Sequence, residues 1–262
     1  MKVFLYLFIL SLSIKLSYAQ NQANFWYFSD YCGLDFKSGI PEVLHDGQTR
    51  TNLGNATISD SLGNLLFYTA KFSVFNKNHL IMDNGDGLAY AGTFGRAIVK
   101  WPGNDNLYYI FNAIHPQMYT GLFYSVVDMS LDSGLGAVTE KEIPVLSAMD
   151  AADRIAIVKK DNSEYVWVIT RKYTDDAFAA YLVDENGFNP NPILCEMPDQ
   201  EASIGHWGYL KLSYNKRFLF SSYMITNDIE VCSFSASDGT IQYMYTINNP
   251  AYLNYPLTAS FL

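Results

Sequence analysis

The sequence predicts an all-β fold: an incomplete β-propeller built of four-stranded antiparallel blades, with about four to six blades. Three observations support this prediction. Aromatic residues make up 16% of the chain and charged residues only 16%, a mix typical of strands. Short apolar runs alternate with polar turns along the chain. The strongest hairpins recur at spacings of roughly 40 to 60 residues, near the length of a blade.

The strands are expected as short runs bounded by turn residues. Segment 59–69, SDSLGNLLFYT, places Gly63 and Asn64 ahead of an apolar run, which is a strong hairpin signal. The same order of strand, polar turn and aromatic-rich strand returns later in the chain. The expected strands span 23–29, 55–60, 65–69, 79–82, 96–101, 107–111, 122–130, 154–160, 164–170, 177–184, 208–213, 217–223, 229–235 and 240–246.

The sequence contains few segments that favour a helix. Only segment 142–154, EIPVLSAMDAADR, has helix-friendly residues, and Pro144 and the lack of a helical period weaken a helix there. A β-sandwich would also alternate strands and turns. A recurring unit favours a propeller, because a blade cannot bury its two faces alone and must stack on its neighbours.

The first 19 residues resemble a signal peptide. Lys2 precedes a short apolar run, and small residues at 17 and 19 predict cleavage between Ala19 and Gln20. A permanent anchor is the alternative, disfavoured because the run is too short to span a bilayer comfortably. Residues 20–262 are then one β-propeller domain. We expect it to be exported to the periplasm, the cell surface or the medium, without membrane insertion after signal removal.

The formal net charge is −9, which disfavours nucleic acid or an anionic membrane as a partner. The three cysteines, Cys32, Cys195 and Cys232, are too few for a disulfide scaffold. Two alternatives stay open. Either Cys195 and Cys232, the closest pair in sequence, form one disulfide, or all three are thiols.

No catalytic residues, metal ligands or cofactors are predicted. There is no GxSxG motif, and the four histidines lack metal-binding spacing. The carboxylate pairs Asp150/Asp153 and Asp175/Asp176 are interpreted as solvated loops, because sequence spacing cannot place two carboxyls across a substrate. The segments DNGDG (83–87) and DENG (184–187) resemble calcium loops but lack the EF-hand spacing, so calcium is only an alternative.

Loop aromatics are the candidates for ligand binding. His206 and Trp207 lie between glycines that permit close approach of a ligand, and Tyr173 lies in another loop. Local packing of these side chains is the alternative. The expected ligand is a glycan or a protein at the cell surface.

Several segments resemble one family of exported proteins. The segments are 26–41, 56–69, 74–88, 106–111 and 124–141. They are similar to the N-terminal propeller-like region of secreted or cell-surface Bacteroidetes proteins that carry gliding-motility-associated (type IX secretion) C-terminal sorting domains. The resemblance implies a secreted β-propeller used for adhesion, display or ligand binding, without established catalytic residues.

The chain departs from this family in two respects. Phe75 stands where the family has Trp, and no sorting domain follows the last expected strand. We therefore expect a truncated relative or a ring of fewer blades.

The expected function is that of an exported, non-enzymatic binding or surface-interaction module. The alternatives are an extracellular hydrolase of polysaccharides on a propeller scaffold, and an inactive fragment of a larger surface protein. A cluster of carboxylates in the central pocket would favour the hydrolase. An aromatic, carboxylate-poor face would favour binding.

Overall fold

The computed structural model describes residues 21–50, 54–89, 91–114, 121–146, 150–172, 176–198, 208–223 and 228–248. These residues form strands joined by turns, with two short 3-10 segments, η1 (Asn21–Ala23) and η3 (Asp132–Gly134). The all-β class is thus confirmed. No helix in the described ranges is long and apolar enough to cross a membrane.

The strands have the following bounds: β1 (Phe25–Phe28), β2 (Cys32–Asp35), β3 (Glu42–Leu44), β4 (Ala56–Ser59), β5 (Leu65–Ala70), β6 (Ser73–Asn76), β7 (Ala91–Lys100), β8 (Leu107–Ile114), β9 (Leu122–Asp128), β10 (Ala137–Leu146), β11 (Ala151–Lys159), β12 (Val166–Lys172), β13 (Ala177–Asp184), β14 (Gly187–Phe188), β15 (Ile193–Glu196), β16 (Leu210–Leu212), β17 (Phe218–Ser222), β18 (Ile229–Phe234) and β19 (Ile241–Ile247).

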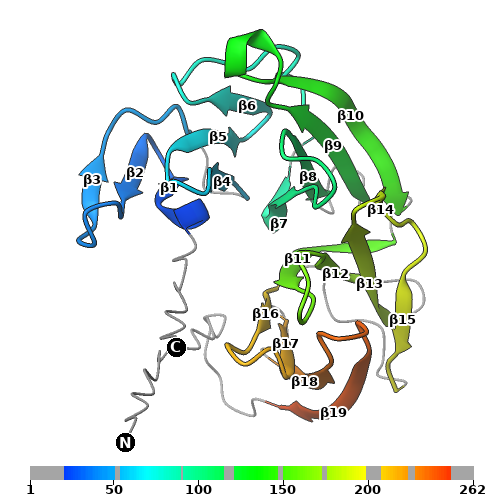
Figure 1. Cartoon of the computed structure of the whole chain (residues 1–262). Coiled ribbons are helices and arrows are strands. Elements are labelled where there is room, and N and C mark those ends of the chain that lie inside the picture. Colours follow the sequence, from blue (N-terminus) through cyan, green and yellow to red (C-terminus); the bar gives the residue numbers. More distant parts are fainter. Residues whose placement is uncertain are drawn as a thin grey trace, which may run out of the picture.

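The strands form five antiparallel units that follow one another around an open arc (Figure 1). We number them in chain order: unit 1 is β1–β3, unit 2 is β4–β6, unit 3 is β7–β10, unit 4 is β11–β15 and unit 5 is β16–β19. Units 3 and 4 are joined into one nine-stranded sheet by a single parallel pair between Arg154 and Phe94. The strands β1, β4, β7, β11 and β16 contact one another in that order on the inside of the arc.

The predicted hairpins are confirmed, and they close in the same way in four units. In unit 2 the backbone N–H of Asp60 donates to the carbonyl of Asn64 at 2.8 Å, and Gly63 has a φ of +85°. The corresponding bonds, each 2.9 Å long, join Trp101 to Leu107, Lys160 to Tyr165 and Ser213 to Phe218. Each of these bonds closes the turn between the innermost strand of a unit and the next strand outward.

The weak helical signal in segment 142–154 is not followed by a helix: residues 142–146 belong to β10 and 151–154 to β11, and Pro144 is tolerated because β10 is the outer edge strand of its sheet. Two sequence expectations differ from the structure. Segment 79–82 is no strand: Leu80 and Ile81 are exposed, and Ile81 makes only an isolated bridge to Phe75. Units 1 and 2 have three strands in the described residues, where four were expected.

The hydrophobic core lies between neighbouring units. Phe67 of unit 2 packs with Ile110 of unit 3 in one cluster. A second cluster includes Phe111 of unit 3 and Val168 of unit 4, and Phe178 of unit 4 shares a third with Leu219 of unit 5. Because each sheet buries its faces against the next one, the recurring hairpins stabilise one another.

Candidate functional site

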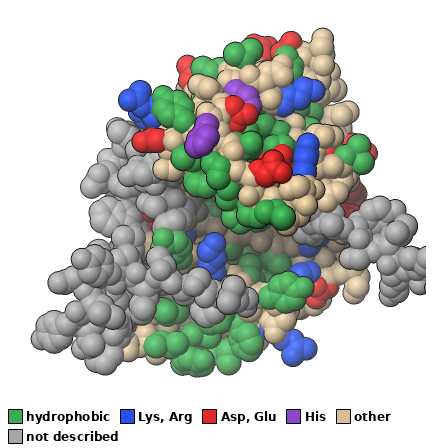
Figure 2. Space-filling view, turned by 90° about the vertical axis from the view of Figure 1, so that its left-hand side faces the viewer, with side chains coloured by type: hydrophobic (Ala, Val, Ile, Leu, Met, Phe, Trp, Pro, Cys, Tyr) green, Lys and Arg blue, Asp and Glu red, His purple; other side chains and the backbone are tan. Residues whose placement is uncertain are grey.

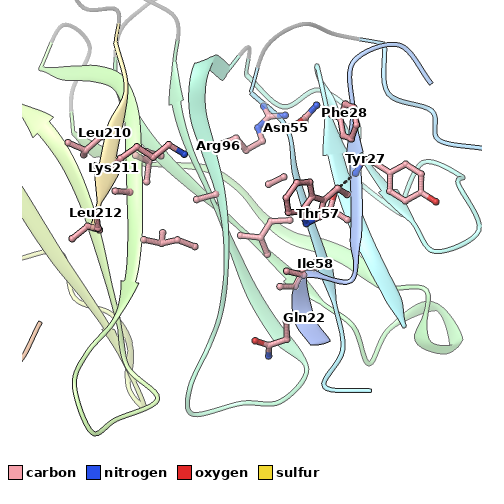
Figure 3. A pocket seen from close by; sticks show the side chains of 18 residues that line it. Gln22, Tyr27, Phe28, Asn55, Thr57, Ile58, Arg96, Leu210, Lys211 and Leu212 are labelled. Carbon is pink, nitrogen blue, oxygen red and sulfur yellow. Dashed lines mark hydrogen bonds between the residues drawn. The ribbon is translucent and has the colours of Figure 1, made fainter. Parts of the chain in front are cut away.

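A central pocket of 840 Å³ lies on the inside of the arc (Figure 3). It is lined by short runs of consecutive residues from the innermost strand of each unit: Trp26–Phe28, 55–58, 96–98, 155–157 and Leu210–Leu212, with Gln22 and Ala23 from η1. We call this space the central pocket and these 18 residues its lining. Five segments far apart in the sequence thus meet in one site.

The pocket is lined by the edges of strands. A sheet face would contribute alternate residues, whereas these strands contribute consecutive ones. β1, β4 and β16 each end their sheet, and β7 pairs with β11 at one position only. Along most of the pocket, backbone N–H and C=O groups therefore face inward without a paired strand in the described ranges.

The charged side chains of the central pocket are basic. Lys211 is exposed, and Arg96 is 7% exposed; none of the 18 residues is Asp or Glu. This contrasts with the formal net charge of −9. Figure 3 shows the Lys211 side chain extending from β16 into the space between β16 and β7. On the open side of the arc, Figure 2 shows a hollow with hydrophobic and basic side chains along it.

Arg96 is held in the wall of the pocket by backbone carbonyls. Its Nη1 donates to the carbonyl of Lys71 at 3.2 Å, and its Nη2 donates to that of Ala89 at 2.9 Å. Burial lowers the pKa of Arg96 to about 10, and the nearby carboxylate of Glu142 opposes this shift. Arg96 thus fixes the position of two loop segments as well as lining the pocket.

Exposed aromatic rings come from β1. Trp26 is 51% and Phe28 38% exposed, and the ring of Phe36 lies 4.9 Å from that of Trp26. Tyr27, between them in sequence, points the other way and is buried, with its ring stacked 4.6 Å from that of Tyr68. The alternation along β1 leaves two rings free to contact a ligand.

A second pocket of 380 Å³ adjoins the central pocket and shares Gln22, Ile58, Ile98 and Ile157 with it. It reaches the hairpin turns of units 3 and 4. There Lys100 pairs with Asp105, and Lys159 pairs with Glu164 at 2.7 Å. The hollow therefore extends along the inner strands toward a rim whose lysines are paired.

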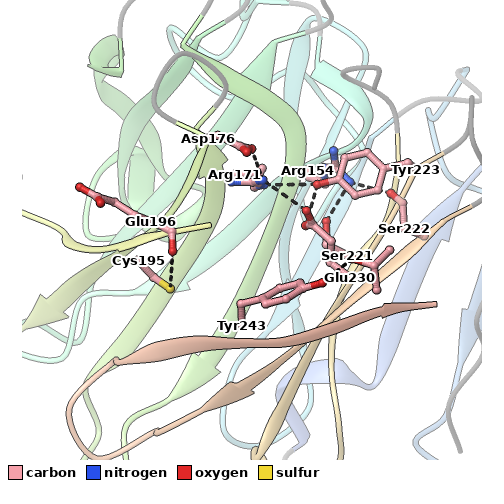
Figure 4. A network of polar contacts seen from close by, with 11 residues as sticks. Arg154, Arg171, Asp176, Cys195, Glu196, Ser221, Ser222, Tyr223, Glu230 and Tyr243 are labelled. Carbon is pink, nitrogen blue, oxygen red and sulfur yellow. Dashed lines mark hydrogen bonds and ion pairs between the residues drawn. The ribbon is translucent and has the colours of Figure 1, made fainter. Parts of the chain in front are cut away.

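A buried polar network lies where units 4 and 5 meet (Figure 4). Arg171 pairs with Asp176, and its Nη2 lies 3.3 Å from Oε1 of Glu230. The Tyr223 hydroxyl donates to Oε2 of Glu230 at 2.6 Å. Arg154 is 1% exposed, and burial lowers its pKa. The carboxylates of this network are thus engaged by arginine and tyrosine.

The sequence-predicted ligand residues His206, Trp207 and Tyr173 lie outside the described residues, as do Ala19 and Gln20 at the expected cleavage site. These assignments stay predictions.

The interpretation of the first carboxylate pair as solvated is wrong. Asp153 is fully buried, and Asp150 pairs with Lys172 at 3.6 Å. In the second pair Asp176 contacts Arg171, while Asp175 lies outside the described residues. Asp150, Asp153 and Asp176 are not among the residues that line the central pocket.

The three cysteines are free thiols. Cys232 is buried, and Cys32 and Cys195 are half-buried. In the part of the chain that the structure describes, no three His, Cys, Asp or Glu residues are placed to hold a metal ion. In the glycine-rich segment 83–87, Asp86 instead accepts a hydrogen bond from the Ser73 hydroxyl at 2.9 Å.

Sequence reasoning missed the central pocket, because its lining depends on strand edges more than on special side chains. One repeated sequence could have pointed to the inner strands. The tetrapeptide AIVK occurs at 97–100 and again at 156–159, and both copies are inner strands that line the pockets.

No family model matches the chain, and no curated protein matches it. The chain is similar to a Bacteroides uniformis protein assigned as a 6-phosphogluconolactonase, with a TM-score of 0.47 and 13% identity over 85% of this chain and 66% of that one. It is also similar to the periplasmic gluconolactonase PpgL of Pseudomonas aeruginosa, with a TM-score of 0.44 and 12% identity over 83% of this chain and 63% of that one.

An exo-β-1,3-galactanase from Phanerochaete chrysosporium matches with a TM-score of 0.39 and 10% identity, over 64% of this chain and 41% of that one. The chain thus spans less than two thirds of the length of these three structures. The likenesses are too weak to support an inference about fold or activity.

Proposed function

We propose that this protein is an exported, non-enzymatic binding module that holds a glycan in its central pocket. The observation that carries the proposal is the absence of Asp and Glu among the 18 pocket residues. Glycoside hydrolysis commonly needs two carboxyl groups about 5 to 10 Å apart across the substrate. Asp176 and Glu230, the carboxylates of the network where units 4 and 5 meet, are engaged by Arg171 and Tyr223 and do not line the pocket.

The pocket has the features of a binding site. Ligand sites are concave and mostly apolar, with a few polar groups that fix orientation. Trp26 and Phe28 offer ring surface to the apolar C–H faces of a sugar, and the strand edges offer backbone donors and acceptors to its hydroxyls. The pocket volume of 840 Å³ is sufficient for a short oligosaccharide.

The proposal also covers the fold, which we assign as a β-propeller. Five antiparallel units around a central pocket support an incomplete β-propeller in which each unit is one blade. It also includes export through the signal at 1–19 and display outside the cytoplasm, in the manner of the gliding-motility-associated proteins that the sequence resembles. Tyr173, His206 and Trp207 are proposed as additional contacts from the loops.

Affinity electrophoresis through gels containing xylan, glucan, alginate or pectate tests the proposal. We expect at least one polysaccharide to retard the protein, and Trp26→Ala to abolish the retardation. Tyr214→Ala is the matched control, because Tyr214 is 98% exposed in a turn outside the pocket. Reducing ends are measured in parallel, and we expect none to be released.

Two outcomes would contradict this function. Release of reducing ends by the wild-type protein would favour the alternative, a hydrolase on a propeller scaffold. No retardation by any polysaccharide, or retardation that Trp26→Ala leaves intact, would show that the central pocket is not a glycan site.

A further inference from the structure

We infer that the glycan held in the central pocket is acidic, a sugar bearing a carboxylate, and that Lys211 pairs with this carboxylate. The inference rests on the proposed function and narrows it to one chemical class. It starts from the one exposed charge among the pocket side chains.

Lys211 differs from the lysines around it. Lys159, Lys172 and Lys216 pair with Glu164, Asp150 and Asp161 at 2.7, 3.6 and 3.2 Å, and Lys100 pairs with Asp105. Lys211 has neither an ion pair nor a side-chain hydrogen bond with any described residue. An exposed lysine without a partner is ordinary on an open surface, but this one extends into a pocket (Figure 3).

The electrostatic setting favours an anion at this position. A protein with a formal net charge of −9 repels anionic ligands at long range. The charge of buried Arg96 is opposed by the nearby carboxylate of Glu142, so exposed Lys211 is the charge that favours an anion in a lining without Asp or Glu. The apolar side chains of Ile98, Ile157 and Leu212 in the same lining add no opposing charge.

A simple anion would contact Lys211 but not the other residues that line the pocket. Inorganic phosphate or acetate would leave the exposed rings of Trp26 and Phe28 and the inward-facing strand edges without partners. A sugar acid presents apolar C–H faces to the rings, hydroxyls to the backbone groups and a carboxylate to Lys211. An acidic glycan thus matches each part of the lining.

Calorimetric titration of the purified protein with matched trisaccharides tests the inference. The acidic probes are trimers of β-1,4-glucuronic, α-1,4-galacturonic and β-1,4-mannuronic acid. Each is compared with the neutral trimer that differs only at C6. We expect at least one acidic trimer to bind about tenfold tighter than its neutral counterpart at low salt, and the preference to shrink as salt is raised.

Lysine variants assign the preference to one side chain. We expect Lys211→Met to weaken binding of the acidic trimer about tenfold and to leave the neutral trimer unchanged. Lys211→Arg should keep the preference, because it keeps the charge. Lys77→Met is the control, since Lys77 is also exposed and without an ionic partner but lies in a turn outside the pocket.

The outcomes separate this inference from the function on which it rests. Equal binding of acidic and neutral trimers, or a preference that survives Lys211→Met, overturns the inference and leaves a glycan-binding module. Failure of every acidic trimer to bind also overturns it. Release of reducing ends from any trimer overturns the proposed function itself.

Discussion

The guanidinium of Arg154 lies over the ring of Tyr223, with Cζ 4.5 Å from the ring centroid. The same guanidinium donates through Nη1 to the Ser221 hydroxyl at 3.0 Å and to the Ser222 carbonyl at 2.6 Å. Arg154 belongs to β11 and the other three residues belong to or directly follow β17. One buried side chain of unit 4 therefore fixes the position of unit 5, and with it the position of Lys211 in β16.

Replacing Arg154 should destabilise the protein. We expect Arg154→Met to lower the free energy of unfolding by about 2–4 kcal/mol, because the buried carbonyl of Ser222 loses its donor and the ring of Tyr223 loses its stacking partner. Urea unfolding measures the change. The exposed Arg217, whose side chain has no partner among the described residues, supplies the control, and Arg217→Met should stay within about 0.5 kcal/mol of wild type. Equal effects of the two variants would contradict this role.

The hydroxyl of Tyr68 should matter more than that of Tyr108. Both tyrosines are buried, but only the Tyr68 hydroxyl has hydrogen-bond partners among the described residues: it accepts from the Gln48 backbone N–H at 2.9 Å and lies 3.2 Å from Nδ1 of His79. We expect Tyr68→Phe to cost about 1–2 kcal/mol of unfolding free energy and Tyr108→Phe less than about 0.5 kcal/mol. Thermal unfolding of the two variants makes the comparison. A larger loss in Tyr108→Phe would contradict it.

Stability should fall in alkali between about pH 10 and 12. Burial raises the pKa of Tyr68 and of Tyr108 from 10.0 to about 12. Between these values the unfolded chain releases protons that the folded protein retains, so a rising pH favours unfolding. The stabilisation is complete below pH 10 and is lost as the pH rises through 12. Urea unfolding at several pH values measures the slope.

Tyr108→Phe is the control for this pH dependence. Removing this one titrating group, while the other buried tyrosines remain, should make the loss of stability shallower by at most about 1.4 kcal/mol per pH unit. An unfolding free energy that stays constant between pH 10 and 12 in the wild-type protein would contradict the prediction.

The three thiols should react in a fixed order. Cys32 and Cys195 are half-buried, whereas Cys232 is fully buried, and burial raises the pKa of Cys232 to about 12. We expect iodoacetamide at pH 8 to label Cys32 first and Cys195 more slowly, because burial also raises the pKa of Cys195. Cys232 should react only in denaturant. Peptide mass spectrometry reads the order, and a Cys195–Cys232 disulfide in the protein would contradict it.

Hairpins were the predictable part of the fold. Turn residues such as Gly63 and Asn64, set before an apolar run, encode local structure that tertiary contacts do not override. Segment 79–82 shows the limit of such reasoning. Its apolar run predicts a strand, yet Leu80 and Ile81 are exposed and Ile81 makes only an isolated bridge to Phe75, because an apolar run alone does not supply the partner strand that a sheet needs.

The candidate site was less predictable, for a physical reason. The central pocket is formed by backbone edges of five strands, and an edge leaves little trace in the choice of side chains. Lys211 has no distinctive sequence context, since lysines also line solvated strands. Lys211 and Trp26 are 185 positions apart in the sequence, and the fold alone places them in the lining of the same pocket.

Hydrogen–deuterium exchange with and without a bound oligosaccharide tests the central claim most directly, because it reads the strand edges themselves. The account predicts that ligand slows amide exchange in 26–28, 55–58, 96–98, 155–157 and 210–212, the segments that line the central pocket. Exchange in the outer strands β6, β10 and β19 should not change. Protection confined to the outer strands, with none along the inner edges, would contradict a binding site in the central pocket.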